Sequence, residues 1–151
     1  MDIARHLDIP TDQDQAFARQ RELATELELT PPIHTPRLIG AADVAYSKEE
    51  GRNEAYAAVV VLDRDTMQVI DSASWVGPPP FDYLPGLFAL REAATLIEAF
   101  RNLKTRPDVM LIDGHGIAHP RRFGLACQLG LVFDLPTIGC AKKRLCGQAE
   151  P

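Results

Sequence analysis

The stretch that decides the fold is Val109-Met110-Leu111-Ile112-Asp113-Gly114-His115-Gly116-Ile117-Ala118-His119-Pro120-Arg121-Arg122. Its first four residues are apolar and predict a short buried strand, which ends on a carboxylate in a glycine-rich turn. Ligand-binding groups commonly lie where a buried strand passes into a loop, and glycine lets the backbone approach a ligand closely. The two arginines that follow offer planar guanidinium groups suited to phosphate. The stretch therefore predicts a metal-dependent enzyme that acts on phosphodiesters.

Outward from this strand, the hydrophobic pattern predicts a single α/β domain with a mixed sheet and helices packed on it. Residues 38–46 are apolar on both faces, which is typical of a central strand covered on both sides. A turn at 63–66 predicts an antiparallel hairpin between two further strands. The remaining predicted elements are strands at 56–62, 67–76 and 136–140 and helices at 12–29, 85–102 and 123–129.

Composition is ordinary for a soluble globular domain, with 46% hydrophobic and 25% charged residues in 151. No apolar run approaches the ~20 residues of a membrane span, and the N-terminus lacks a signal-peptide pattern, so we expect a cytoplasmic location without membrane partners. The three cysteines form no C-x-x-C pair, which gives little support to a disulfide framework or a zinc site. A net charge of −5 argues mildly against nucleic-acid binding, but the basic residues bunch locally at 121–122 and 142–144.

Three acidic residues occupy positions where acids are costly: Asp43 in mid-strand, Asp113 at a strand end, and Glu92 on a largely apolar helix face. Burying an unpaired carboxylate costs several kcal/mol in practice, so acids from separate elements invite a shared divalent cation. Ligation by oxygen alone favours Mg²⁺ or Mn²⁺ over zinc, in a site with one or two ions. Taken singly, each acid is more often a helix cap or an ion-pair partner, and Asp43 is the strongest candidate because aspartate is disfavoured within strands.

Three longer motifs resemble the endonuclease V family of inosine-directed nucleases, at residues 83–92, 113–124 and 136–147. The strand that contains Asp43 fits the first acidic motif of that family. The resemblance implies an RNase H-like fold, a mixed central sheet flanked by helices. It also implies DNA repair of deaminated adenine, by Mg²⁺-dependent hydrolysis of the second phosphodiester 3′ to deoxyinosine.

The resemblance also implies roles for individual residues. Asp43, Glu92 and Asp113 become the metal-site carboxylates, and Lys142 a catalytic lysine near the scissile phosphate. The implied substrate-binding residues are a wedge that enters the duplex, positions around the flipped base, and a stretch that faces the substrate: Tyr83, Leu84 and Pro85; Gly86 and Gly114; and His119 and Arg121.

The physics of base recognition agrees with a wedge, because a base inside a duplex must be extruded to be read and a planar side chain can fill the gap. Tyr83 lies in a proline-stiffened segment, although a tyrosine packed on the sheet edge is the alternative. Asp82 stands where the family wedge usually begins with proline, and its charge would weaken binding near phosphate.

The family continues well beyond the equivalent of residue 151, and its C-terminal portion supplies a further metal-site residue and covering helices. We therefore expect a single endonuclease V domain at 1–151 that lacks this portion and is weakly active or inactive, and a monomer. DNA containing deoxyinosine is the expected partner, with inosine-containing RNA as the alternative substrate. A nuclease of the same fold with another substrate, and a non-catalytic nucleic-acid binding fragment, both remain open.

Overall fold

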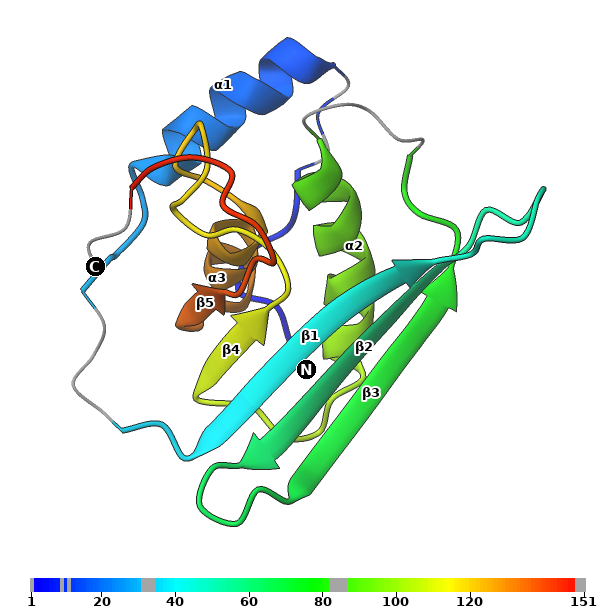
Figure 1. The fold of residues 1–151 in the computed structure, drawn as a ribbon, viewed down its shortest axis with the longest axis vertical. Helices are drawn as coiled ribbons and strands as arrows, with labels where there is room; N and C mark the ends of the chain where they lie inside the picture. The colour runs from blue at the N-terminus through cyan, green and yellow to red at the C-terminus, as the bar shows by residue number, and fades with distance from the viewer. Residues whose placement is uncertain (1, 9, 11, 31–34, 82–86, 149–151) are drawn as a thin grey trace.

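The computed structural model describes residues 2–8, 10, 12–30, 35–81 and 87–148, and these residues form one sheet with helices packed on it (Figure 1). The strands are β1 (Leu38–Tyr46), β2 (Ala55–Asp63), β3 (Val69–Gly77), β4 (Val109–Ile112) and β5 (Thr137–Gly139). The helices are α1 (Gln13–Ala24), α2 (Phe88–Arg101) and α3 (Leu125–Phe133).

The sheet is mixed, with the strand order β3-β2-β1-β4-β5. The first three strands run antiparallel and form two consecutive hairpins. A tight turn that begins at residue 63 connects β2 to β3. β4 and β5 run parallel to β1, and each is reached through a helical crossover. The predicted mixed sheet and the predicted hairpin between β2 and β3 are both confirmed.

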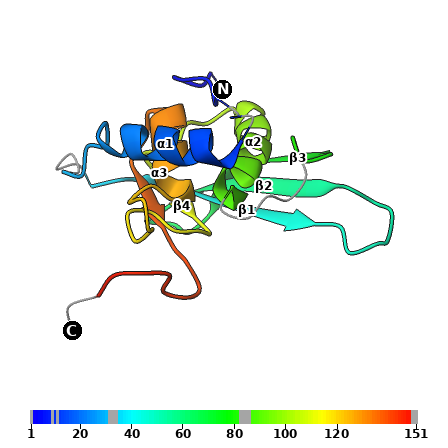
Figure 2. The ribbon, with the colours of Figure 1, turned by 90° about the horizontal axis from the view of Figure 1, so that it is seen from above.

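The core lies on one face of this sheet, where α2 and α3 pack against alternating residues of the strands. In β2 the buried positions are Ala55, Ala57, Val59 and Val61, as expected for a strand with one covered face. Phe100 of α2 stacks on Phe133 of α3 with ring centroids 3.8 Å apart. Figure 2 shows the three helices on the same side of the sheet.

The prediction that the first strand is covered on both sides is wrong in the described part of the chain. Gly40 and Ala42 face the helices and are buried, whereas Asp43 and Ala45 are exposed. Apolar composition alone does not distinguish a covered face from an open one, because alanine is compatible with both. The open face matters for function because it leaves Asp43 accessible.

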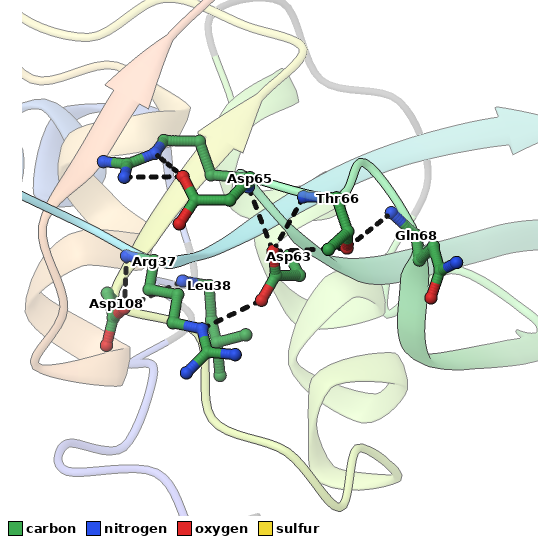
Figure 3. A network of polar contacts seen from close by, with 8 residues as sticks. Arg37, Leu38, Asp63, Asp65, Thr66, Gln68 and Asp108 are labelled. Carbon is green, nitrogen blue, oxygen red and sulfur yellow. Dashed lines mark hydrogen bonds and ion pairs between the residues drawn. The ribbon is translucent and has the colours of Figure 1, made fainter.

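A polar network at the start of β1 aligns this strand with β4 and closes the turn after β2 (Figure 3). The Asp108 carboxylate accepts hydrogen bonds of 2.8 Å from the backbone N–H groups of both Arg37 and Leu38, and so joins the starts of β1 and β4. Asp63 is only 4% exposed and accepts from the Thr66 and Asp65 backbone N–H groups, each at 3.0 Å. The bond from Thr66 contributes most to lowering the pKa of Asp63 to about 2, followed by the bond from the Arg37 side chain.

The helices differ from their predicted bounds at their ends. α1 starts at Gln13, where the Asp12 carboxylate caps the helix by accepting from the Gln15 backbone N–H at 2.8 Å, but it stops at Ala24 and not at the predicted residue 29. α3 begins two residues later than predicted because Arg122 adopts a left-handed conformation (φ 52°) before it. None of the described helices combines the length and the apolar character needed to cross a bilayer.

Candidate active site

Two of the predicted carboxylates come from neighbouring parallel strands in matched register. Ala42 of β1 pairs with Ile112 of β4, so the next residues along the chain are Asp43 and Asp113. The Asp113 backbone N–H donates to the Ala42 carbonyl at 3.2 Å, which extends the ladder past the end of β4. Because neighbouring strands lie about 4.8 Å apart, this register brings the two side chains together at the carboxyl end of β4.

The third carboxylate, Glu92, approaches from α2 and is buried, with 7% of its surface exposed. Burial is the largest cause that raises the pKa of Glu92, and the nearby negative charges of Asp43 and then Asp113 raise it further, to about 8. The three acids therefore interact electrostatically, as the sequence predicts for a shared site. Of the three, only Glu92 is deeply buried, since Asp43 is exposed and Asp113 is partly exposed.

Lys142 reaches this acidic group from the segment that follows β5. Its Nζ lies 2.5 Å from Asp113 Oδ2, and this hydrogen bond is the main cause that raises the pKa of the lysine. The side chain is 82% exposed, so the ion pair is accessible to solvent and can exchange partners at little energetic cost. The structure thus places the exposed ammonium group of Lys142 beside Asp113, one of the predicted metal ligands.

The donor set fits a hard divalent cation, although the described side chains are not gathered around one point. Within the described residues, no three Asp, Glu, His or Cys side chains meet closely enough to hold a common ion. Burial is the main cause of the raised pKa of Glu92, and the negative charges of Asp43 and Asp113 raise it further despite the opposing charge of Lys142. A cation with oxygen ligands would offset both the burial of Glu92 and the repulsion among the three acids, so Asp43, Glu92 and Asp113 remain the predicted ligands.

Two residues that the sequence analysis did not single out adjoin Glu92. The guanidinium carbon of Arg91 lies 4.6 Å from the centre of the Tyr46 ring. Among the described residues, the buried Tyr46 hydroxyl and Arg91 Nε have no hydrogen-bond partner. Burial, then the charge of Glu92, raises the pKa of Tyr46 to about 12, which keeps the hydroxyl protonated. Their positions in the sequence could have identified both residues, because Tyr46 ends the strand that contains Asp43 and Arg91 directly precedes Glu92.

The glycine-rich turn after Asp113 packs against the segment that carries Lys142. His115 Nε2 lies 2.9 Å from the Lys143 carbonyl oxygen, and the Cys140 backbone N–H donates to the Ile112 carbonyl. A Cβ on Gly139 would lie 2.5 Å from the Gly116 nitrogen and 2.6 Å from the Gly114 oxygen. Only glycine allows this approach of two backbones.

Replacing Gly139 by alanine is expected to lower the free energy of unfolding by about 1–3 kcal/mol, because the clash is with backbone that cannot rotate away. Gly116→Ala is the matched control, since its Cβ would find its nearest neighbour at 3.8 Å, an ordinary contact. Chemical denaturation of both variants measures the difference. Equal stability of the two variants would contradict the tight packing of the turn.

His119 and Arg121 lie in the same loop but away from the carboxylates. Burial, then Arg121 and His115, lowers the pKa of His119 to about 4, so its ring is neutral near pH 7. Arg121 packs on α1, where its Nε donates to Gln20 Oε1 at 2.5 Å and its guanidinium lies 3.8 Å from the Phe17 ring centre. These contacts hold Arg121 in place on the helix, and a role toward substrate stays a prediction for both residues.

Gly114 lies directly after Asp113, packed against Leu125, where it was predicted to border a flipped base. The predicted wedge of Tyr83, Leu84 and Pro85, together with Asp82 and Gly86, lies outside the described residues. The four predicted catalytic residues thus interact electrostatically near the end of β4, since Asp43, Asp113 and Lys142 all act on the pKa of Glu92 and Lys142 contacts Asp113.

Known proteins of one family share both the sequence motifs and the fold of this chain. The sequence model of the Endonuclease V family matches residues 21–151. An Endonuclease V from Gloeobacter violaceus is 40% identical over 136 residues, which are 90% of this chain and 55% of that protein. The crystal structure of an Endonuclease V from Streptomyces avermitilis superposes with a TM-score of 0.81 at 43% identity, covering 89% of this chain and 59% of the other.

A third match is the Endonuclease V of Ciona intestinalis, crystallised in complex with DNA containing an inosine followed by a ribo-adenosine. It superposes with a TM-score of 0.75 at 27% identity and covers 85% of this chain and 57% of the other. The chain thus spans little more than half the length of these matches. The similarities confirm the RNase H-like α/β fold, and the chain belongs to the endonuclease V family.

Proposed function

We propose that this chain carries the catalytic carboxylates of an endonuclease that hydrolyses the second phosphodiester 3′ to deoxyinosine in DNA, with Mg²⁺ or Mn²⁺. The observation that supports the proposal is that matched strand register places Asp43 beside Asp113, and that both charges act on the buried Glu92, whose pKa burial and these charges raise to about 8. A raised pKa in a group of acids with a nearby lysine is typical of functional sites.

The residues divide the work by their chemistry. Asp43, Glu92 and Asp113 would hold the cation, which when bound supplies charge neutralisation and an activated water. Lys142, whose ammonium is paired with Asp113 and largely exposed, would donate to a phosphate oxygen of the substrate. Tyr46 stays protonated near Glu92, because burial and then the charge of Glu92 raise its pKa to about 12.

The choice of an inosine substrate rests on the family and on the loop after β4. The Ciona relative was crystallised with inosine-containing DNA. In this chain Gly114 would border the flipped base, a neutral His119 would act by hydrogen bonding, and Arg121 would face phosphate. Tyr83, Leu84, Pro85 and Gly86 would supply the wedge and its neighbour. Repair of deaminated adenine in the cytoplasm is the corresponding cellular role that we propose.

Cleavage of matched oligonucleotides tests this function. With enzyme in excess to reveal slow turnover, a labelled DNA duplex with one inosine is expected to be cut at the second phosphodiester 3′ to it in Mg²⁺. The adenosine duplex and the reaction in EDTA are expected to remain uncut. An RNA strand of the same sequence measures the alternative substrate. Cleavage that ignores inosine, or that survives EDTA, would overturn the proposal, and binding without cleavage would favour the non-catalytic alternative.

A further inference from the structure

A groove rimmed by arginines lies between the end of α1 and the loop that follows β4. It has a volume of about 390 Å³, within the range of roughly 300–1,000 Å³ typical of ligand-binding clefts. We call it the arginine groove and define it by Arg21, Leu27, Leu29, Ile117, Arg121 and Arg122. Figure 1 shows the loop rising from the carboxyl end of β4 toward α1.

The groove is positively charged although the chain as a whole carries −5. No acidic side chain of the described residues lines it. Two acids of α1 and its extension are paired with arginines outside the groove, since Glu22 bonds Arg19 at 2.7 Å and Glu26 bonds Arg5 at 2.6 Å, and the exposed Glu28 between Leu27 and Leu29 does not itself line the groove. Burial lowers the pKa of Arg121, and the nearby positive charge of Arg21 lowers it further. Crowded like charges of this kind favour an anionic ligand.

The walls of the groove are fixed relative to each other before any ligand binds. Leu23 of α1 packs against Phe123 and Cys127 at the start of α3, so the helix is docked on the loop. Arg121 links the two walls through Gln20 and Phe17 of α1. On the loop side, the Arg122 backbone N–H donates to the His119 carbonyl at 2.7 Å. A pre-formed anion site loses less conformational entropy when it binds.

The groove lies within reach of a polymer bound at the carboxylates. Ile117 is four residues after Asp113, so their Cα atoms are at most about 14 Å apart. The exposed Leu29 and Ile117, with the partly buried Leu27, add apolar surface to the groove, which suits a ligand that alternates charged phosphates with sugars. A single small anion would leave that apolar surface unused.

We propose that the arginine groove binds the sugar–phosphate backbone of the nucleic acid, with Arg21 and Arg122 each contacting a phosphate away from the scissile bond. The inference rests on the proposed function and deepens it by adding a second contact surface. Such contacts position the substrate without reading its bases. The groove therefore raises affinity for inosine-containing and inosine-free strands alike.

The test measures binding of labelled duplexes to the double variant Arg21→Gln/Arg122→Gln by fluorescence anisotropy, in Ca²⁺ and across a range of salt concentrations. Loss of two phosphate contacts is expected to lower the slope of log K against log salt by about 1.8 and to weaken binding roughly ten- to sixtyfold near 0.1 M salt. The same change is expected for the inosine and the adenosine duplex. An RNA strand of the same sequence shows whether the groove prefers either polymer.

The matched control is Arg52→Gln/Arg64→Gln, which removes the same charge from the two hairpin turns of the antiparallel strands. A second variant, Arg21→Lys/Arg122→Lys, keeps the charge and is expected to keep most of the salt slope; it also guards against misfolding of the glutamine variant. If Arg21→Gln/Arg122→Gln binds as tightly as the wild type, or if the control variant weakens binding equally, the proposed role of the arginine groove is wrong. Either result would leave the nuclease proposal unaffected. A wild-type chain that binds no nucleic acid would overturn both.

Discussion

Replacing Asp43 by asparagine is expected to reduce cleavage of inosine-containing DNA more than roughly a hundredfold, while leaving nucleic-acid affinity nearly unchanged. Losses of that size follow removal of a group that only supports a metal ligand, and a ligand itself should cost at least as much. Asp43 is exposed on the open face of β1 and forms no ion pair among the described residues, so its removal breaks little of the fold. Single-turnover cleavage and anisotropy measurements separate the two effects.

Asp65→Asn is the control for this prediction, because Asp65 is an exposed aspartate paired with Arg64 in the turn between β2 and β3. It should cleave like the wild type. If Asp43→Asn retained wild-type cleavage, the carboxylate would have no part in the chemistry. If it lost binding in parallel with cleavage, the residue would belong to the binding surface.

Replacing Glu92 by glutamine is expected to abolish cleavage and, in the absence of divalent cations, to make the protein more resistant to unfolding at alkaline pH. In the folded chain the pKa of Glu92 rises from 4.5 to about 8. Between these values the folded state binds more protons than the unfolded state, so the free energy of unfolding falls as pH increases. This contribution is fully present below about pH 4.5 and is lost by about pH 8.

Glutamine does not titrate, so Glu92→Gln should lack this decline. Relative to its own value near pH 4.5, its stability at pH 8 should exceed that of the wild type by an amount on the order of a few kcal/mol. Urea denaturation in EDTA across this range measures the difference. Glu98→Gln is the control on the same helix, because Glu98 is paired with Arg101 and more exposed. Parallel pH profiles for wild type and Glu92→Gln would contradict the burial of an uncompensated acid.

Much of the fold could be predicted from the sequence because apolar, valine-rich runs bounded by turn residues are typical of strands. The runs at 56–62 and 109–112 located β2 and β4 to within one residue. Helix ends were less predictable, since they depend on local bonds such as that from the Thr25 hydroxyl to the Glu22 carbonyl. The positive φ of Arg122 is likewise invisible in composition.

The residues proposed for the candidate site could be selected from the sequence, and their roles stay predictions, whereas the surroundings of these residues could not be predicted. The sequence pattern placed Asp43 within a strand and Asp113 at the end of another strand. The two become neighbours because the sheet pairs these strands in matching register. The pairing of Lys142 with Asp113 and the stacking of Arg91 on Tyr46 depend on side-chain directions that only the fold defines. Burial also could not be ranked in advance, since Asp63 is more buried than Asp43 yet serves a turn.

The central claim is that Asp43, Glu92 and Asp113 share a divalent cation, and Mn²⁺ titration followed by electron paramagnetic resonance tests it most directly. The account predicts Mn²⁺ binding by the wild type that competes with Mg²⁺ and is weakened at least roughly tenfold in each of Asp43→Asn, Glu92→Gln and Asp113→Asn, but not in Asp65→Asn. Mn²⁺ affinity that is the same in all of these proteins would contradict it.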